Sequence, residues 1–177
     1  CDSVEFYQNN LLETFKKLAS TENYPSKISA STLMPHIYKK LDESNRKDIL
    51  ETFVNLSKED TPMVRRGVAA SLSLLMSQMN RNEIKTNIVP LLKEFFNDNI
   101  DSVRVCALES LPVLYQTLEG EPILNEIIDF IQEKELVKKG WRVRYALAEV
   151  LPQICKFLSF LFQFIQIEII RKLLYRL

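Results

Sequence analysis

The chain has 177 residues, of which 46% are hydrophobic and 26% charged, and its 23 basic side chains balance its 23 acidic ones. This composition is typical of a folded, soluble chain, and zero net charge argues against nucleic-acid or anionic-membrane partners held by bulk electrostatics. Three glycines and seven prolines are too few turn formers for a β-sandwich or barrel. We therefore expect a mostly helical protein.

The cysteine and hydropathy patterns bear on the compartment. Cys1, Cys106 and Cys155 are odd in number and widely spaced, so they fit neither a disulfide framework nor a zinc-ligand pattern. This usage predicts a reducing compartment, which we expect to be the cytoplasm and also the nucleus. The most apolar stretch, 157–170, is interrupted by two glutamines and a glutamate, so we expect no membrane span.

Apolar stretches and polar turns alternate along the chain. Outer helices are expected at 4–18, 49–56, 84–96 and 123–137, and polar turns at 21–26, 59–63, 97–102 and 138–141. An inner helix is expected after each turn. Ser44 or Asn45 and Asn82 are the expected N-caps, and Pro25 and Pro62 suit the first turn of an inner helix, where a missing N–H is harmless.

The inner helices repeat with a period of 38 to 40 residues, as the spacing of Ser26, Val64, Val103 and Val143 shows. Positions 4, 8, 11 and 15 after each of these residues are apolar and form one helical stripe. By position the stripe is Ala30, Val68, Ala107, Leu147; Met34, Leu72, Leu111, Leu151; Ile37, Leu75, Leu114, Ile154; and Leu41, Met79, Leu118, Leu158.

Three prolines share one position inside the inner helices. Pro35, Pro112 and Pro152 all lie nine residues after the first residue of their repeat. A proline inside a helix removes a hydrogen bond and costs roughly 3 kcal/mol, so the coincidence predicts a kink at the same height in each inner helix. Pro90 plays a similar part in an outer helix.

Two helices per repeat of this length indicate an all-α fold, an α-α superhelix of the HEAT-repeat, armadillo-like class. We expect a solenoid over residues 1–158, with repeats at about 4–41, 43–80, 82–119 and 121–158. Residues 159–177 are expected to form an apolar C-terminal helix, a truncated or altered fifth repeat.

A basic residue begins every inner helix, and acids lie in the turns nearby. We interpret this set as a structural ladder of charge-assisted hydrogen bonds that fixes the register of successive repeats. Its members are Lys27, Arg65, Arg104 and Arg144, with Asp60, Asp98 and Asp101.

The turn sequences carry a family resemblance. The strings at 60–66 (Asp-Thr-Pro-Met-Val-Arg-Arg), 101–104 (Asp-Ser-Val-Arg) and 141–145 (Trp-Arg-Val-Arg-Tyr) resemble successive repeats of the scaffold (A, 65-kilodalton regulatory) subunit of protein phosphatase 2A. The strings at 87–90 and 24–30 fit that family's order too. The match is to the middle of the family's amino-terminal half. It departs at Lys27, usually Arg, at Gly67, usually Ala, and at Gly140, usually Ser.

The resemblance implies a non-catalytic scaffold that presents its intra-repeat turns to a B-type regulatory subunit. It also implies that the catalytic subunit binds repeats absent here. The turn residues expected to contact the partner are Pro62, Met63, Arg66, Asn99, Ser102, Trp141 and Arg142. Trp141 beside Arg142 has the composition of an interface hot spot, although a tryptophan packed on the arginine of its own turn explains the pair nearly as well.

Catalytic chemistry is not expected from these residues. His36, the only histidine, falls outside the apolar stripe with no nucleophile motif around it, and Cys106 and Cys155 read as small buried hydrophobes. No phosphate loop or metal-ligand spacing occurs, so we expect no catalytic residue, metal or cofactor. The alternatives are a karyopherin-like or other HEAT adaptor and, less favoured, a nucleic-acid-processing HEAT enzyme, which needs a basic groove.

Overall fold

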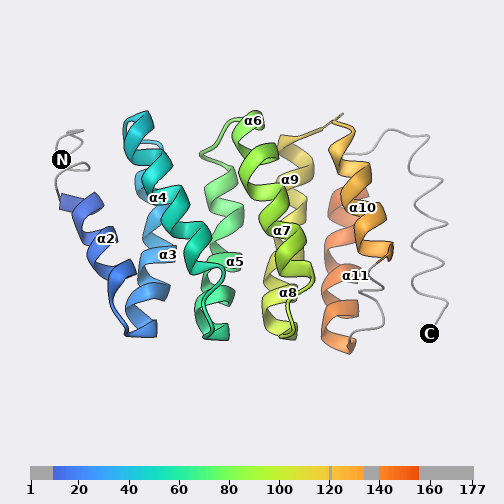
Figure 1. Cartoon of the computed structure of the whole chain (residues 1–177). Coiled ribbons are helices and arrows are strands. Elements are labelled where there is room, and N and C mark those ends of the chain that lie inside the picture. Colours follow the sequence, from blue (N-terminus) through green and yellow to red (C-terminus); the bar gives the residue numbers. More distant parts are fainter. Residues whose placement is uncertain (1–9, 120, 134–139, 156–177) are drawn as a thin grey trace. The chain divides into compact units, whose positions relative to one another are not determined.

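The computed structural model describes residues 10–119, 121–133 and 140–155, drawn in colour in Figure 1. The chain divides into two compact units, Cys1–Leu92 and Lys93–Leu177, and each is described by itself. Every regular element in the described part of the chain is a helix. The predicted apolar helix over 159–177 lies outside the described residues.

In the first unit, two inner helices lie side by side and outer helices cover them. The inner helices are α3 (Tyr24–Tyr38) and α5 (Pro62–Met76), and the outer ones are α2 (Leu12–Ser20) and α4 (Glu43–Leu56). α3 packs mainly on α5 and on α2, while α4 lies against both inner helices (Figure 1). A short α6 (Arg81–Glu83) and a π-helical turn η2 (Ile84–Ile88) follow.

In the second unit, α11 (Trp141–Cys155) packs against α8 (Asp101–Glu109) and α9 (Leu111–Thr117). The outer helix α10 (Ile123–Glu133) is tied to them by the Tyr115 hydroxyl, which donates to the Leu124 carbonyl at 3.0 Å. Helix α7 (Val89–Phe96) spans the boundary between the units, and its Phe96 ring lies 6.4 Å from the Phe130 ring of α10.

The predicted apolar stripe is the core of both units. Every described member is buried except Leu151, which is half-buried; Leu158 lies outside the described residues. Small residues at the first stripe position, such as Ala30 and Ala107, are fully covered, which lets the inner helices approach closely. The all-α, HEAT-type solenoid class predicted from the repeat is confirmed.

The helix starts differ from those predicted. Asp42, not Ser44 or Asn45, caps α4, because its side chain accepts from the Asn45 N–H at 2.8 Å. The helix therefore begins six residues before the apolar stretch 49–56 that predicted it. Asn80, not Asn82, caps α6 in a capping box with Glu83. Both helices begin with a polar first turn that precedes their apolar residues. The spacing of apolar residues alone therefore does not predict where these helices start.

The prolines behave in three ways. Pro25 and Pro62 lie in the first turn of α3 and α5, as predicted, and α3 and α11 continue through Pro35 and Pro152. The predicted common kinked helix is wrong for the third repeat. There the inner helix divides at Ser110 into α8 and α9, with Pro112 in the first turn of α9.

The division at Ser110 has a local cause. Pro112 has no N–H to donate to the carbonyl four residues earlier, so the regular ladder is already broken there. The Ser110 N–H and hydroxyl both donate to the Ala107 carbonyl, at 3.2 and 2.7 Å, in place of the α-helical pattern. Before Pro90, the wide turn η2 relieves the same conflict in the outer helix.

Two buried tyrosines hold elements together. The Tyr38 hydroxyl donates to Glu83 Oε1 at 3.0 Å and so ties α3 to the cap of α6. Burial, reinforced by this hydrogen bond, raises the pKa of Tyr38 far above its usual range. Burial, with the nearby charge of Asp129, does the same to the pKa of Tyr115.

These shifts predict alkaline destabilisation. The folded state holds each tyrosine proton more tightly than the unfolded chain does. The contribution of the two protonated tyrosines to the free energy of unfolding is therefore complete below pH ~10. It is lost as the pH rises above that value, by about 1.4 kcal/mol per pH unit for each tyrosine. The double variant Tyr38→Phe/Tyr115→Phe should show a shallower fall in unfolding free energy between pH 9 and 11, measured by urea denaturation. Tyr24→Phe, at an exposed position, is the control. An unchanged slope in the double variant would contradict the assignment.

Candidate protein-interaction site

The turn between α4 and α5 and the start of α5 carry three of the predicted partner contacts, of which Pro62 is half-buried. Pro62 opens α5, and Met63 and Arg66 follow on its first turn. Met63 is 47% exposed and Arg66 is exposed as well, whereas the intervening Val64 is fully buried. Val64 anchors the start of α5 to the core, and Met63 and Arg66 face solvent.

Two basic residues, Lys27 and Arg65, stabilise the turn between α4 and α5. Lys27 Nζ lies 2.6 Å from Glu59 Oε1, and both side chains are largely covered. Arg65 donates to the carbonyls of Glu59 and Asp60 at 2.7 and 2.9 Å. Lys27 belongs to the preceding repeat, so its ion pair joins two repeats, while the bonds of Arg65 to these carbonyls order the turn that begins its own helix.

The turn between α7 and α8 is braced in a similar way. Arg104 is buried and donates both to the Asp98 carbonyl and to the Asp101 carboxylate. A buried guanidinium needs such partners, because an unpaired charge there would be strongly destabilising. Asn99 and Ser102, the predicted partner contacts of this turn, are exposed on either side of this braced core.

The start of α11 carries the most exposed aromatic residues of the described chain. Trp141 is 63% exposed and Tyr145, one helical turn later, is 59% exposed. The Arg142 guanidinium lies 5.1 Å from the centre of the Trp141 ring, a cation–π stack. Trp141 therefore packs on the arginine of its own turn and also faces solvent, whereas its role as a partner contact stays a prediction.

Gly140 sets the backbone before this aromatic cluster. Its φ of +157° is one that side chains disfavour, and a Cβ added there would lie 2.9 Å from Asp101 Oδ2. Asp101 is the partner of Arg104. The glycine thus lets the start of α11 approach the braced turn of the preceding repeat. Arg144, the fourth basic residue of the predicted ladder, is half-buried, and its N–H donates to the Gly140 carbonyl at 3.2 Å.

Three residues of interest were not predicted. Glu59 is the ion-pair partner of Lys27, and its opposite charge in the next turn is a detectable signal. Tyr145 is exposed on the same first turn as Trp141, and the hydrogen bond and charge of Glu149 raise its pKa. Leu74 is 42% exposed, and its place outside the apolar stripe distinguishes it from the core leucines.

In the part of the chain that the structure describes, the histidine, cysteine and acidic side chains form no candidate catalytic or metal site. His36 is exposed, Cys106 is buried, and the side chain of Cys155 is outside the description. Among residues 10–119, 121–133 and 140–155, no cluster of three His, Cys, Asp or Glu side chains could hold a metal ion. No helix there has the length and apolar character needed to span a membrane.

Comparison with curated proteins gives relatives over most of the chain. A Saccharomyces cerevisiae protein, named as the A-type regulatory subunit of protein phosphatase PP2A, is 29% identical over 158 residues, covering 82% of this chain and 25% of that protein. A Schizosaccharomyces pombe protein of the same name is 23% identical over 162 residues, covering 88% and 27%. This chain is related to the regulatory A subunits of protein phosphatase 2A.

The name scaffold also occurs among the relatives. A Dictyostelium discoideum protein phosphatase 2A scaffold subunit is 30% identical over 85 residues, covering 48% of this chain and 15% of that protein. No protein-family model matches the chain. The chain spans about a quarter of the length of the two yeast proteins, and the resemblance read from the turn strings is confirmed.

The geometry at Gly140 gives a stability prediction. Gly140→Ala should destabilise the second unit by about 1–3 kcal/mol, because the new Cβ meets both an unfavourable φ and the Asp101 carboxylate. Thermal unfolding followed by circular dichroism would measure it. Ala148→Gly, at an exposed position inside α11, is a matched control limited to about 1 kcal/mol of helix propensity. A Gly140→Ala variant as stable as the unaltered chain would refute the close approach.

Proposed function

We propose that the chain is a non-catalytic scaffold of a serine/threonine protein phosphatase 2A complex and that it presents its intra-repeat turns to a B-type regulatory subunit. The names of its relatives support the scaffold role. The single structural observation that carries the surface assignment is the exposed Trp141, stacked by Arg142 at the start of α11. Tryptophan and arginine dominate the binding energy of many protein interfaces.

The mechanism that we propose is geometric. Cations brace the turns before two inner helices: Lys27 and Arg65 hold the turn before α5, and Arg104 holds the turn before α8, so the exposed residues of these turns are held in place before a partner arrives. Preorganised contacts lose less conformational entropy on binding. Helix pairs contacting their neighbours can also flex without losing their local cores, which suits a scaffold that holds two proteins at a set separation.

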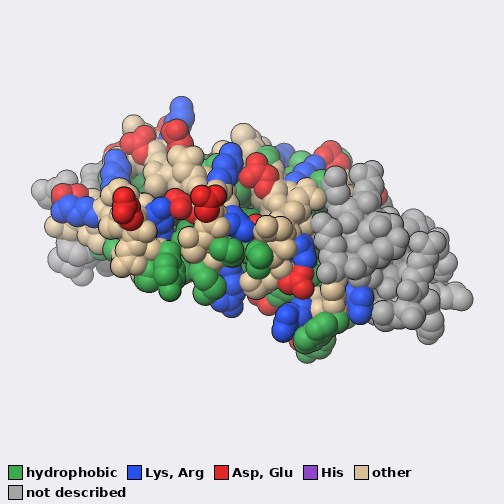
Figure 2. Space-filling view, turned by 60° about the horizontal axis from the view of Figure 1, so that its bottom comes forward, with side chains coloured by type: hydrophobic (Ala, Val, Ile, Leu, Met, Phe, Trp, Pro, Cys, Tyr) green, Lys and Arg blue, Asp and Glu red, His purple; other side chains and the backbone are tan. Residues whose placement is uncertain are grey.

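The surface charge supports a protein partner over a nucleic acid. Lys and Arg side chains are interspersed with Asp and Glu side chains over the coloured face in Figure 2. A nucleic-acid-processing enzyme would need a basic groove to neutralise phosphates. A karyopherin-like adaptor has no observation in its favour. We place the scaffold in the cytoplasm and also in the nucleus.

Trp141→Ala should weaken binding of a purified phosphatase 2A regulatory subunit by about 2 kcal/mol, roughly thirtyfold, because it removes the largest exposed side chain of the turn. Arg66→Glu should weaken binding as well, through a reversed charge at the α5 turn. Isothermal titration calorimetry on the complete chain would measure both. Gln116→Ala, exposed on α9, is the control. Absent binding, or equal affinity in all variants, would sink this proposal.

The proposal also predicts that the purified chain does not hydrolyse phosphoserine or phosphothreonine peptides. Incubation with such a peptide, with and without Mn²⁺, and assay of released phosphate would check this. Turnover that increases in proportion to the concentration of pure chain, and that follows the chain through a second chromatographic step, would show that it is an enzyme.

A further inference from the structure

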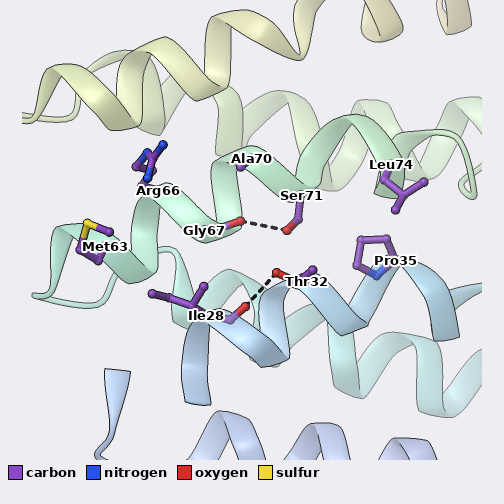
Figure 3. Close-up of a pocket in the computed structure, with 9 residues that line it drawn as sticks. All are labelled: Ile28, Thr32, Pro35, Met63, Arg66, Gly67, Ala70, Ser71 and Leu74. Atoms are coloured by element: carbon purple, nitrogen blue, oxygen red, sulfur yellow. Dashed lines mark hydrogen bonds between the residues drawn. The ribbon is translucent and has the colours of Figure 1, made fainter. Parts of the chain in front are cut away.

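A groove of about 360 Å³ opens between α3 and α5 in the first unit (Figure 3). Met63 and Arg66 lie at one end of it, and Leu74 and Pro35 at the other. Ile28 and Gly67 line the middle from the two helices. The volume falls in the range of small-ligand and peptide side-chain pockets.

Gly67 lets α5 lie close to α3 at the groove. A Cβ added there would lie 3.1 Å from Ser31 Oγ and 3.3 Å from Ile28 Cγ2, so a larger residue would press on α3. The hydroxyls of Thr32 and Ser71 donate to the carbonyls of Ile28 and Gly67 within their own helices. With these hydroxyl hydrogens used internally, the middle of the groove presents mainly apolar surface.

The repeat supplies an internal comparison for the exposed apolar residues. The position of Leu74 is occupied by His36, Val113 and Gln153 in the other repeats, and that of Met63 by Pro25, Ser102 and Arg142. The fold therefore does not require apolar side chains at these positions. Met63 and Leu74 are 47% and 42% exposed, so both ends of the groove present apolar surface to a partner.

Charge at one end indicates the chemistry of the occupant. Arg66 is exposed, and no carboxylate of the described residues pairs with it. A carboxylate of a partner would form a charge-assisted pair there. Arg66 and Leu74 are eight residues apart on α5, a rise of about 12 Å at 1.5 Å per residue. An extended chain covers about 12 Å in three to four residues.

We propose that this groove binds an extended peptide segment of a partner protein, with a carboxylate on Arg66 and an aliphatic side chain between Pro35 and Leu74, three or four residues away. The inference rests on the proposed function, in which the chain holds other proteins, and it assigns a second contact away from the turn of Trp141. Among the residues that line the groove, Arg66 is the one basic residue. A peptide carboxylate can use one such cation, whereas a membrane surface would need a broad basic face.

Two capped peptides test the proposal: Gly-Glu-Ser-Ser-Ser-Leu-Gly and its reverse order, each titrated into the complete ¹⁵N-labelled chain. At least one order should bind saturably, with a dissociation constant of about 0.1–1 mM, and shift the amides of residues 28–34 and 63–74. The same peptides with Lys in place of Glu, or with Ser in place of Leu, should bind at least about fivefold more weakly.

Variants of the chain complete the test. Arg66→Glu should raise the dissociation constant of the Glu-containing peptide at least about tenfold, and Leu74→Gln should raise it about fivefold. Arg81→Glu and Val113→Gln, which place the same substitutions elsewhere, should leave binding unchanged. Failure of both peptide orders to saturate, equal binding of the Lys peptide, or unaltered affinity in Arg66→Glu and Leu74→Gln would each overturn the groove assignment.

The two proposals fail separately. If the peptides bind the groove but no regulatory subunit binds the chain, the proposed function falls and the groove stands. If a regulatory subunit binds and Trp141→Ala weakens it while neither peptide saturates, the groove falls and the proposed function stands.

Discussion

The close packing of consecutive inner helices is the constraint on which the rest of each unit depends. Small stripe residues such as Ala30 and Ala107 are fully buried, which lets the inner helices approach closely. That contact sets where each inner helix begins and hence where the turn before it lies. The cations at the helix starts then brace the turns: Lys27 on Glu59 across a repeat boundary, and Arg104 on Asp101 within its own turn. The buried helix contacts and the ion pairs together hold the exposed residues of the turns in fixed positions.

Function follows from what the framework leaves uncovered. A core made only of the apolar stripe would not need an exposed Trp141, Met63 or Leu74, and each of these lies at a position that other repeats fill with different residue types. The repeat thus separates two kinds of residue. Those that recur at one position hold the helices together, and those that break the pattern on the surface are the candidates for recognition. Gly140 and Gly67 have another role, because each lets neighbouring elements approach more closely than a side chain would allow.

The sequence predicts the inner helices better than the outer ones. Leu72 and Leu75 lie in a periodic apolar stripe and are buried as expected, because burial of a helix face leaves a direct trace in residue spacing. The start of α4 at Glu43 leaves no such trace, since its first turn is polar and held by Asp42. The pairing of Lys27 with Glu59 and the φ of Gly140 depend on how separate repeats meet, which spacing along one repeat does not reveal. The helix divides at Ser110 in the third repeat, whereas α3 and α11 continue through prolines at the same position, so a shared proline position does not by itself predict where a helix breaks.

The central claim is that the intra-repeat turns form the partner-binding surface. Hydrogen–deuterium exchange of the complete chain, alone and with a phosphatase 2A regulatory subunit, tests it most directly, because amide protection reports where a partner covers the backbone. If the partner covers the intra-repeat turns, exchange should slow at 59–66, 99–104 and 141–145, and the opposite turns at 39–42 and 77–80 should be unchanged. Protection confined to 39–42 and 77–80 would contradict the central claim.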